Sequence, residues 1–242
     1  MPKLEAYHRD LPYSYATGIF PATECLLACP DRCLRLLVHS RATESEGVGR
    51  LTEACERAGI RVEQADRALE RIARKENCYA AMVFAKQEAD LDGNTPHVVL
   101  HHPADSGNTG AVLRTCLALG VEQVAIIRPA VDVYEPRVVR ASMGAMFRMN
   151  LRHFDNFDGY RAAFPAHEIY PFMLAGSVAL EQAARAAREP YTLVFGNEGT
   201  GLPVAFAEYG QSVRIPQSDK VDSLNLAAAV AIGVYAFQLE RE

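Results

Sequence analysis

The sequence predicts an α/β protein in two regions, a small α/β unit followed by a larger layered domain with a mainly parallel sheet. Short apolar runs alternate along the chain with amphipathic segments of helical period. Between the two regions lies KQEADLDGNTP, residues 86–96, which is polar, contains Gly and Pro, and has no periodicity. We therefore expect domains at residues 1–88 and 97–242, with a linker at 89–96.

Residues 1–88 are expected to form a unit of alternating strands and helices. The segment EGVGRLTEACERAG is amphipathic, with Leu51 and Cys55 on one face and Gly59 at its end. CYAAMVFA is typical of a buried strand. The expected helices are 17–28, 46–59 and 67–76, and the expected strands are 33–40, 60–66 and 78–85.

Residues 97–242 restart with HVVLHHP, which reads as a strand that ends in a turn. The following segment, NTGAVLRTCLALG, is an amphipathic helix with Asn108 as its expected N-cap and Gly120 as its stop. Pro136 favours the start of another helix. The expected strands are 97–103, 121–129, 148–154, 170–176, 191–196 and 212–216, and the expected helices are 108–120, 135–147, 179–188 and 223–240.

The composition is that of an ordinary globular protein: 49% of the 242 residues are hydrophobic and 23% are charged. The N-terminal residues lack the pattern of a signal peptide, and no run of about 18 apolar residues occurs. We therefore expect a cytoplasmic protein that has no membrane partner.

The net charge of −5 argues weakly against a nucleic-acid partner, because such partners favour a basic surface. One stretch is an exception, because five arginines between residues 128 and 153 face only two carboxylates. This predicts a local basic face on an acidic protein. The five arginines are Arg128, Arg137, Arg140, Arg148 and Arg152.

Three of the six cysteines, Cys25, Cys29 and Cys33, are spaced C-x3-C-x3-C, which invites a metal interpretation. Metal knuckles usually use CxxC pairs, and Pro30 breaks any helix that would align the three. Free cysteine also behaves as a small buried hydrophobe. We expect core packing and predict no metal site.

Ligands of open α/β sheets bind outside the carboxyl ends of strands, and three expected strand ends carry unusual residues. After the expected strand 97–103, Asn108 and Arg114 allow two interpretations. In one, Asn108 is a helix N-cap and Arg114 is solvated. In the other, Arg114 is held at the strand–helix junction to bind an anion. After the second, GNEGTGLP is either a tight turn or a loop that exposes backbone to a ligand. After the third, Ser223 and Asn225 precede an apolar helix, which one of them caps.

The glycine loop fits neither a P-loop nor the dinucleotide fingerprint G-x-G-x-x-G, and Glu198 within it argues against a phosphate. Taken together, NTGAVLRT, FGNEGTGL and IPQSDKVDSLNLAAA resemble the three motifs of the SpoU/TrmH-type RNA 2′-O-ribose methyltransferases of the SPOUT superfamily. VVRASMGAMFRMNL is also similar to this family. The resemblance covers residues 97–240. More loosely, GIFPATECLL and KENCYAAMVF resemble the ribosomal-protein-like substrate-binding domain that often precedes it.

The resemblance implies a deep trefoil knot in the second domain, S-adenosyl-L-methionine as cofactor, a ribosomal or transfer RNA substrate, and a homodimer. It assigns Arg114 to the ribose and its deprotonation, directly or through the phosphate, with Asn108, Glu198, Ser223 and Asn225 lining the cleft. It assigns cofactor contacts to Gly196, Gly201, Ile215, Leu224 and Asn225. RNA contacts are expected from Arg137, Arg140 and Arg148. Asp219 stands where many family members have glycine, which leaves the detail of the cofactor contacts open.

Two alternatives remain. The first is a SPOUT-like fold that has lost catalysis and binds RNA, which the intact set of Asn108, Arg114, Glu198 and Asn225 disfavours. The second is a Rossmann-type methyltransferase or oxidoreductase, which the lack of G-x-G-x-x-G after any early strand disfavours.

Overall fold

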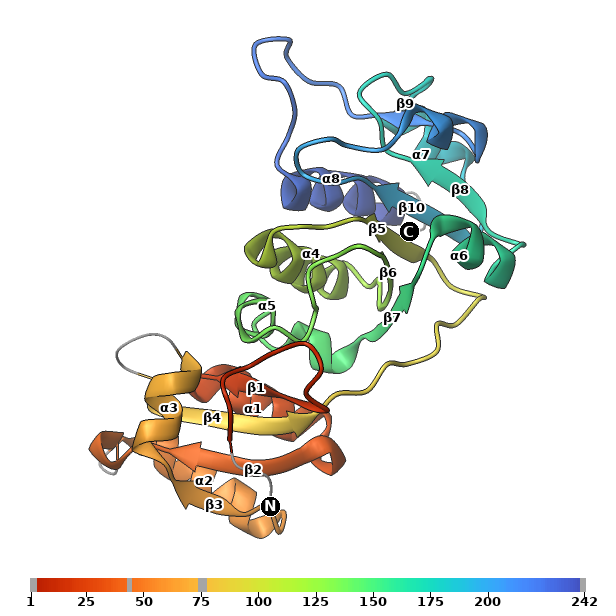
Figure 1. Ribbon diagram of the computed structural model, residues 1–242. Coiled ribbons are helices and arrows are strands. Elements are labelled where there is room, and N and C mark those ends of the chain that lie inside the picture. The colour runs from red at the N-terminus through yellow and green to blue at the C-terminus, as the bar shows by residue number, and fades with distance from the viewer. Residues whose placement is uncertain (1–3, 43–44, 74–77, 240–242) are drawn as a thin grey trace. The chain divides into compact units, whose positions relative to one another are not determined.

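The computed structural model describes residues 4–42, 45–73 and 78–239 and divides into two compact units (Figure 1). The first unit joins the chain up to Gln87 with Asp132–Arg148. The second unit joins Glu88–Val131 with the chain from Met149 on. The chain leaves the first unit after Gln87, and residues 132–148 return to it, which no local pattern in the sequence indicated.

The first unit is built on a four-stranded sheet in the order β1-β4-β2-β3. Strand β4 runs antiparallel to β1 and to β2, and β3 is parallel to β2. The strands are β1 (Tyr13–Thr17), β2 (Cys33–Val38), β3 (Val62–Gln64) and β4 (Ala80–Ala85), and the helices are α1 (Ile19–Ala28), α2 (Glu46–Arg57) and α3 (Asp66–Ala73). Strand β1 was not anticipated, although all five of its residues are buried. The end of the expected helix 67–76 lies outside the described residues.

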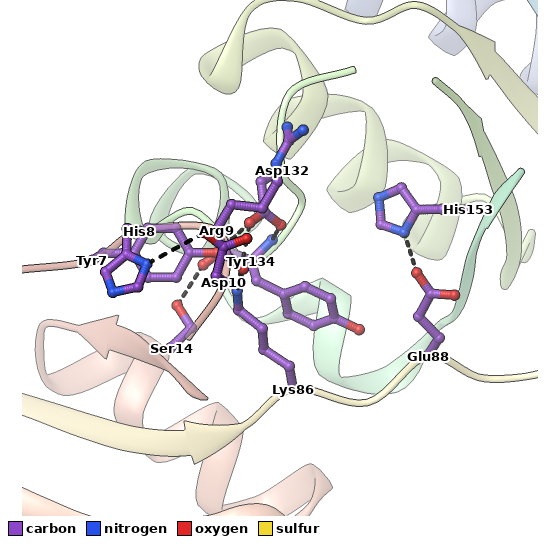
Figure 2. A network of polar contacts seen from close by, with 10 residues as sticks. All are labelled: Tyr7, His8, Arg9, Asp10, Ser14, Lys86, Glu88, Asp132, Tyr134 and His153. Atoms are coloured by element: carbon purple, nitrogen blue, oxygen red, sulfur yellow. Dashed lines mark hydrogen bonds and ion pairs between the residues drawn. The ribbon is translucent and has the colours of Figure 1, made fainter. Parts of the chain in front are cut away.

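A polar cluster fixes the start of the 132–148 segment within the first unit (Figure 2). The Tyr7 hydroxyl donates to the Asp132 carboxylate, and the Lys86 ammonium lies 3.5 Å from the same group. Lys86 also lies over the rings of Tyr7 and Tyr134, 4.6 Å and 5.7 Å from their centroids. Burial lowers the pKa of Lys86, and the charge of Asp132 opposes that shift. The segment is therefore held by contacts that are distant in sequence.

The rest of this segment differs from the expected helix 135–147. Helix α5 (Pro136–Ala141) ends early, because Met143 and Gly144 adopt positive φ angles of 50° and 84°. Gly144 is required there, since a Cβ would lie 2.3 Å from the Cβ of Glu24. A 3-10 turn, Ala145–Arg148, follows, and Phe147 packs edge-to-face on Phe84.

The second unit contains a five-stranded sheet in the order β7-β6-β5-β10-β8, and every neighbouring pair is parallel. This confirms the expected mainly parallel sheet. The strands are β5 (His97–His101), β6 (Gln123–Ile127), β7 (Asn150–Phe154), β8 (Glu168–Pro171) and β10 (Tyr191–Phe195), and β9 (Val178–Ala179) pairs separately with β11 (Val213–Arg214). The helices are α4 (Ser106–Ala118), α6 (Phe157–Ala163), α7 (Leu180–Ala186) and α8 (Leu226–Leu239). Helix α6 and strand β9 were not anticipated.

The chain order places a topological switch point between β5 and β10. From β5 the chain proceeds to β6 and β7 on one side, whereas β10 and β8 lie on the other side. The loops that leave β5 and β10 therefore diverge from adjacent carboxyl ends, where open α/β sheets bind ligands. Helices α4 and α8 lie side by side in this unit (Figure 1).

The expected linker has no helix or strand, but it is not a free connection. Leu91 is 7% exposed and belongs to the hydrophobic core of the second unit, with Phe164 and Val194. The backbone N–H of Asp92 donates to the side chain of Gln123. Polar composition correctly indicated a loop, and these contacts hold Leu91 and Asp92 of that loop against the second unit.

The cysteines are all free thiols, and five of the six are buried. Pro30 ends α1 as expected, yet it does not separate the three clustered cysteines. The Cys25 sulfur lies 3.9 Å from that of Cys29 and 3.7 Å from that of Cys33. Among the described residues no group of three metal-ligating side chains has a geometry that could hold a metal ion. No helix in residues 4–42, 45–73 or 78–239 is long and apolar enough to cross a membrane.

Two buried histidines anchor the loop before β5. His97 is fully buried, and its ring nitrogens lie 2.8 Å from the Tyr160 hydroxyl and 2.8 Å from the Asp92 carbonyl oxygen. The Tyr160 hydroxyl is 2.7 Å from that of Thr192, which is 2.8 Å from His167. Burial lowers the pKa of His97 to about 4, and burial also lowers the pKa of His167.

We expect acid to destabilise this unit through His97. Between its unfolded pKa of about 6.5 and its folded pKa of about 4, the unfolded chain binds more protons, so the free energy of unfolding falls as pH falls. The expected loss from His97 is about 2 kcal/mol between pH 7.5 and pH 5. Urea unfolding at both pH values measures it. A His97→Gln variant cannot take up this proton and should lose correspondingly less; an equal loss in both proteins would contradict the assignment.

Candidate active site

The first part of the site is the turn from β5 into α4. His102, directly after β5, has a positive φ of 56°. The N-cap of α4 is Asp105, whose carboxylate accepts the backbone N–H of Asn108 at 2.7 Å. The expectation that Asn108 caps this helix is therefore wrong. Because the Asp105 side chain is the cap and accepts the Asn108 N–H, the Asn108 side chain is available for other contacts.

The second part is Glu198, from the loop that follows β10. Its carboxylate accepts the backbone N–H groups of Ala104 and Asp105, both at 3.0 Å, and lies 3.5 Å from the Asn108 amide nitrogen. A carboxylate at this position is also favoured by the positive end of the α4 dipole. Glu198 thus fastens the β10 loop to the beginning of α4, a structural role that the sequence did not reveal.

The third part is Asn225, directly before α8. Its side-chain oxygen accepts the backbone N–H of Ala227 at 2.9 Å, which makes it a helix cap. Its amide nitrogen donates to the Asn108 side-chain oxygen at 2.9 Å. Asn108 therefore lies between Glu198 and Asn225, and one line of polar contacts joins the three predicted motifs at the switch point.

The glycine loop closes by backbone contact. A Cβ on Gly196 would lie 2.2 Å from the carbonyl carbon of Gly201, which itself has a φ of +66°. Asn197 stabilises the loop, because its side-chain oxygen accepts the N–H of Gly199 at 2.9 Å and its amide donates to the His102 carbonyl at 2.8 Å. We did not predict a role for Asn197, although asparagine two residues before glycine is a turn signal.

The remaining cofactor candidates lie in residues 215–225, which form no helix or strand. Ile215 and Leu224 are partly buried, and Ser223 is exposed. The structure does not join Ser223 to the Asn108 cluster. The sequence analysis did not anticipate that the backbone of Gly176, after β8, packs closely on the backbone of Val213. A Cβ on Gly176 would lie 2.4 Å from it.

Arg114 is exposed on α4 and lies apart from the Asn108 cluster. Six residues separate it from Asn108, which is about 9 Å along a helix axis. Within the described ranges it forms no hydrogen bond or ion pair. It lines an open groove of about 460 Å³ between α4 and α8, and the other lining residues are Thr115, Ala118, Leu119, Ala231, Ile232 and Tyr235.

The predicted basic face is largely neutralised. Arg148 pairs with Glu24 at 2.9 Å within the first unit. In the second unit, the guanidinium groups of Arg128 and Arg152 pair with carboxylates at 2.8 Å and 2.6 Å. Arg137 and Arg140 remain exposed, on α5 of the first unit. Three of the five arginines in this stretch are therefore paired with carboxylates, and the surface carries less unpaired positive charge than the sequence indicated.

Two substitutions at Asn225 separate helix capping from positioning of Asn108. Asn225→Ala removes the cap and should lower the free energy of unfolding by about 1 kcal/mol. Asn225→Asp keeps a capping oxygen but cannot donate to Asn108. We expect it to retain stability at pH 7 while losing at least about tenfold in catalytic rate, because misplaced reacting groups are costly. Denaturation and single-turnover methyl transfer test this; full activity of Asn225→Asp would exclude the positioning role.

Comparison with known proteins identifies the family of the chain. Residues 95–235 match the SpoU rRNA Methylase family. A ribosomal RNA small subunit methyltransferase G 2 of Syntrophobacter fumaroxidans is 35% identical over 133 residues, which are 55% of this chain and 25% of that protein. The 23S rRNA (guanosine-2′-O-)-methyltransferase RlmB of Acinetobacter baylyi is 24% identical over 238 residues, 91% of this chain and 95% of that one. The chain thus spans only a quarter of the length of the first relative.

A solved structure extends the likeness to both units. The AdoMet-bound rRNA methyltransferase of Sinorhizobium meliloti superposes with a TM-score of 0.79 at 25% identity, covering 94% of this chain and 87% of that one. Since the family match takes in more than half of the chain, the protein belongs to the SpoU rRNA Methylase family. This confirms the resemblance inferred from the three motifs.

Proposed function

We propose that the protein transfers a methyl group from S-adenosyl-L-methionine to a ribose 2′-hydroxyl of ribosomal or transfer RNA in the cytoplasm. The line of contacts through Glu198, Asn108 and Asn225 carries this proposal. It assembles the three motifs at the switch point of a parallel sheet, where this family membership implies methyl transfer. Named relatives that methylate RNA support the same reaction.

The residues at this end of the sheet fit the cofactor. Backbone-to-backbone packing at Gly196 and Gly176 leaves main-chain groups, rather than cationic side chains, at the ends of β10 and β8. Glu198 would repel a phosphate but not a zwitterionic ligand with a sulfonium. We assign cofactor contacts to Gly196, Gly201, Ile215, Leu224 and Asn225, and we infer that the loops carrying them form the family's knot. The bound cofactor supplies an electrophilic methyl group on positive sulfur.

The side chains of this chain then have distinct tasks. Arg114 contacts the ribose and its phosphate and helps to remove the hydroxyl proton, because an unactivated hydroxyl is a weak nucleophile. The hydrogen bond between Asn225 and Asn108 holds the start of α8 against the start of α4, beside the glycine loop. Glu198 fixes that loop to α4. Ser223 lines the entrance.

The position of Arg114 supports a homodimer. It lies in an apolar groove, with Ile232 and Tyr235 exposed at 39% and 54%. The groove is continuous with the face of α8, and a second copy that covers it would bury these side chains favourably. A partner would also bring Arg114 beside the motifs of the other subunit, which explains its separation from Asn108.

Incubation of the full chain with radiolabelled S-adenosyl-L-methionine and total bacterial RNA tests the proposal. Label should enter RNA and should not enter protein or DNA. Binding of RNA without any transfer, together with no affinity for the cofactor, would instead identify an inactive RNA-binding member of the family.

A further inference from the structure

Three cysteine side chains meet at the end of α1 in the first unit, apart from the candidate active site. Cys25 lies in the C-terminal half of α1, Cys29 is the C-cap of that helix, and Cys33 begins β2. The Cys25 sulfur is 3.9 Å from that of Cys29 and 3.7 Å from that of Cys33. Sulfur atoms at this separation need only a small movement to reach bonding distance, which is about 2 Å.

Cys29 lies just beneath the surface of the first unit. Cys25 is fully buried, whereas Cys29 and Cys33 are 6% and 9% exposed. The chain around Cys29 is open to solvent, because Leu27 is 64% exposed and Pro30 is exposed as well. A small uncharged oxidant such as hydrogen peroxide can therefore reach the Cys29 sulfur, while Cys25 is shielded from it.

The surroundings of Cys29 favour its thiolate, which is the form of cysteine that reacts with oxidants. A hydrogen bond from the Cys25 thiol lowers the pKa of Cys29. Burial and the charge of Asp31 oppose this shift, but the charges of Arg32 and Arg148 reinforce it. Hydrogen bonds to the neighbouring sulfurs, followed by burial, raise the pKa of Cys25. One sulfur of the pair is therefore disposed to lose its proton, and the other retains it.

We propose that Cys29 and Cys25 are a peroxide-sensitive pair that forms a disulfide. The Cys29 thiolate bonds to one oxygen of hydrogen peroxide as the O–O bond breaks, which gives a sulfenic acid and a hydroxide ion. The Cys25 sulfur then attacks the Cys29 sulfur, and the S–S bond forms as the S–O bond breaks. The Cys25 proton leaves with the hydroxyl group as water. In total the two sulfurs lose two electrons, and the peroxide gains them.

The disulfide acts on the segment that returns to the first unit. Glu24 directly precedes Cys25 on α1 and pairs with Arg148 at 2.9 Å. The backbone of Gly144 also packs on the Glu24 side chain, because a Cβ at this glycine would lie 2.3 Å from the Cβ of Glu24. Drawing the two sulfurs together distorts the part of α1 that carries Glu24. Oxidation therefore loosens the 3-10 turn Ala145–Arg148, and a thiol reductant restores it.

Peptide mapping of the full chain tests the pair. The tryptic peptide 10–32 contains Cys25 and Cys29, whereas Cys33 falls in peptide 33–35. After brief exposure to hydrogen peroxide and alkylation in denaturant, peptide 10–32 should carry no alkyl group and should be lighter by two hydrogen atoms. Dithiothreitol should reverse this change. Cys55 and Cys116 should remain alkylated, because burial raises their pKa values to about 11 and about 12.

Hydrogen exchange measures the effect on the returning segment. In the 3-10 turn, the N–H of Phe147 bonds to the Gly144 carbonyl at 3.1 Å. Oxidation should speed exchange within residues 144–148 about two- to fivefold, because the turn loses a partly exposed ion pair. Cys29→Ser treated in the same way should form no disulfide and show no change. The matched control Cys78→Ser replaces a partly buried cysteine that is not part of the pair, and it should respond as the unsubstituted protein does.

Two results on the unsubstituted chain would overturn the pair, whether or not a variant folds. The first is two alkylated thiols in peptide 10–32 under conditions that oxidise free cysteine. The second is a disulfide that joins this peptide to peptide 33–35, because it would include Cys33 in place of Cys25 or Cys29. Unchanged exchange of residues 144–148 in a chain that has formed the Cys25–Cys29 disulfide would overturn its effect on the returning segment.

Discussion

Replacing Arg114 by alanine is expected to lower the rate of methyl transfer by two to four orders of magnitude, the usual contribution of a positioned proton-transfer group. The side chain is exposed and unpaired within the described chain, so its removal should cost little stability. It lies on α4, away from the glycine loop, so affinity for the cofactor should be unchanged. Single-turnover kinetics at saturating RNA, with calorimetry for the cofactor, measure the two effects separately.

Two further variants sharpen this test. Arg161→Ala removes another partly exposed arginine of the second unit and should remain close to full activity. Arg114→Lys keeps the charge but loses the planar fork that suits ribose and phosphate, so it should recover only part of the rate. Near-normal turnover of Arg114→Ala would remove this residue from the mechanism.

Introducing a charge into the α4–α8 groove is expected to separate the subunits and abolish methyl transfer. Ile232→Glu places a carboxylate among apolar side chains that a partner would cover, where an unpaired charge is strongly unfavourable. Sedimentation should show a monomer that still binds the cofactor. Ala186→Glu, at the exposed last residue of α7, adds the same charge outside the groove and should stay dimeric and active. An active monomer would contradict the role of the interface.

Mixing two variants whose activity is expected to be low shows which subunit uses Arg114. If the arginine acts on the partner's motifs, a dimer of Arg114→Ala with Asn225→Ala contains one intact site, because each subunit supplies what the other lacks. Random exchange should then restore about a quarter of full activity, since half of the dimers are mixed and each has one working site of two. If Arg114 acts within its own subunit, no combination restores activity.

The sequence predicted what local patterns encode. Branched apolar runs identified β5, β6 and β10, which are buried along their whole length. Gly196 could be assigned to a tight backbone approach, because only glycine permits the closure that the structure shows. The motifs also placed Asn108, Glu198 and Asn225 after three different strands, and hydrogen-bonding contacts join these side chains in the structure.

Other features depend on tertiary contacts that no local pattern carries. Asp105 caps α4 instead of Asn108, because both residue types are good caps and the sequence does not choose between them. Residues 132–148 belong to the first unit through Lys86 and Phe84, which lie far away in the chain. Arg148 was expected to be available to RNA, but it forms an ion pair with Glu24. A count of charges along the sequence does not show ion pairs between distant segments.

The position of the transferred methyl group tests the account most directly. The full chain should be incubated with methyl-labelled S-adenosyl-L-methionine and unmodified RNA transcripts, and the RNA should be digested to nucleosides for mass spectrometry. The account predicts that the label resides on the ribose as a 2′-O-methyl nucleoside, and that Arg114→Ala forms this nucleoside at least about a hundredfold more slowly. A label on a base, or no label in RNA from a chain that binds the cofactor, would contradict it.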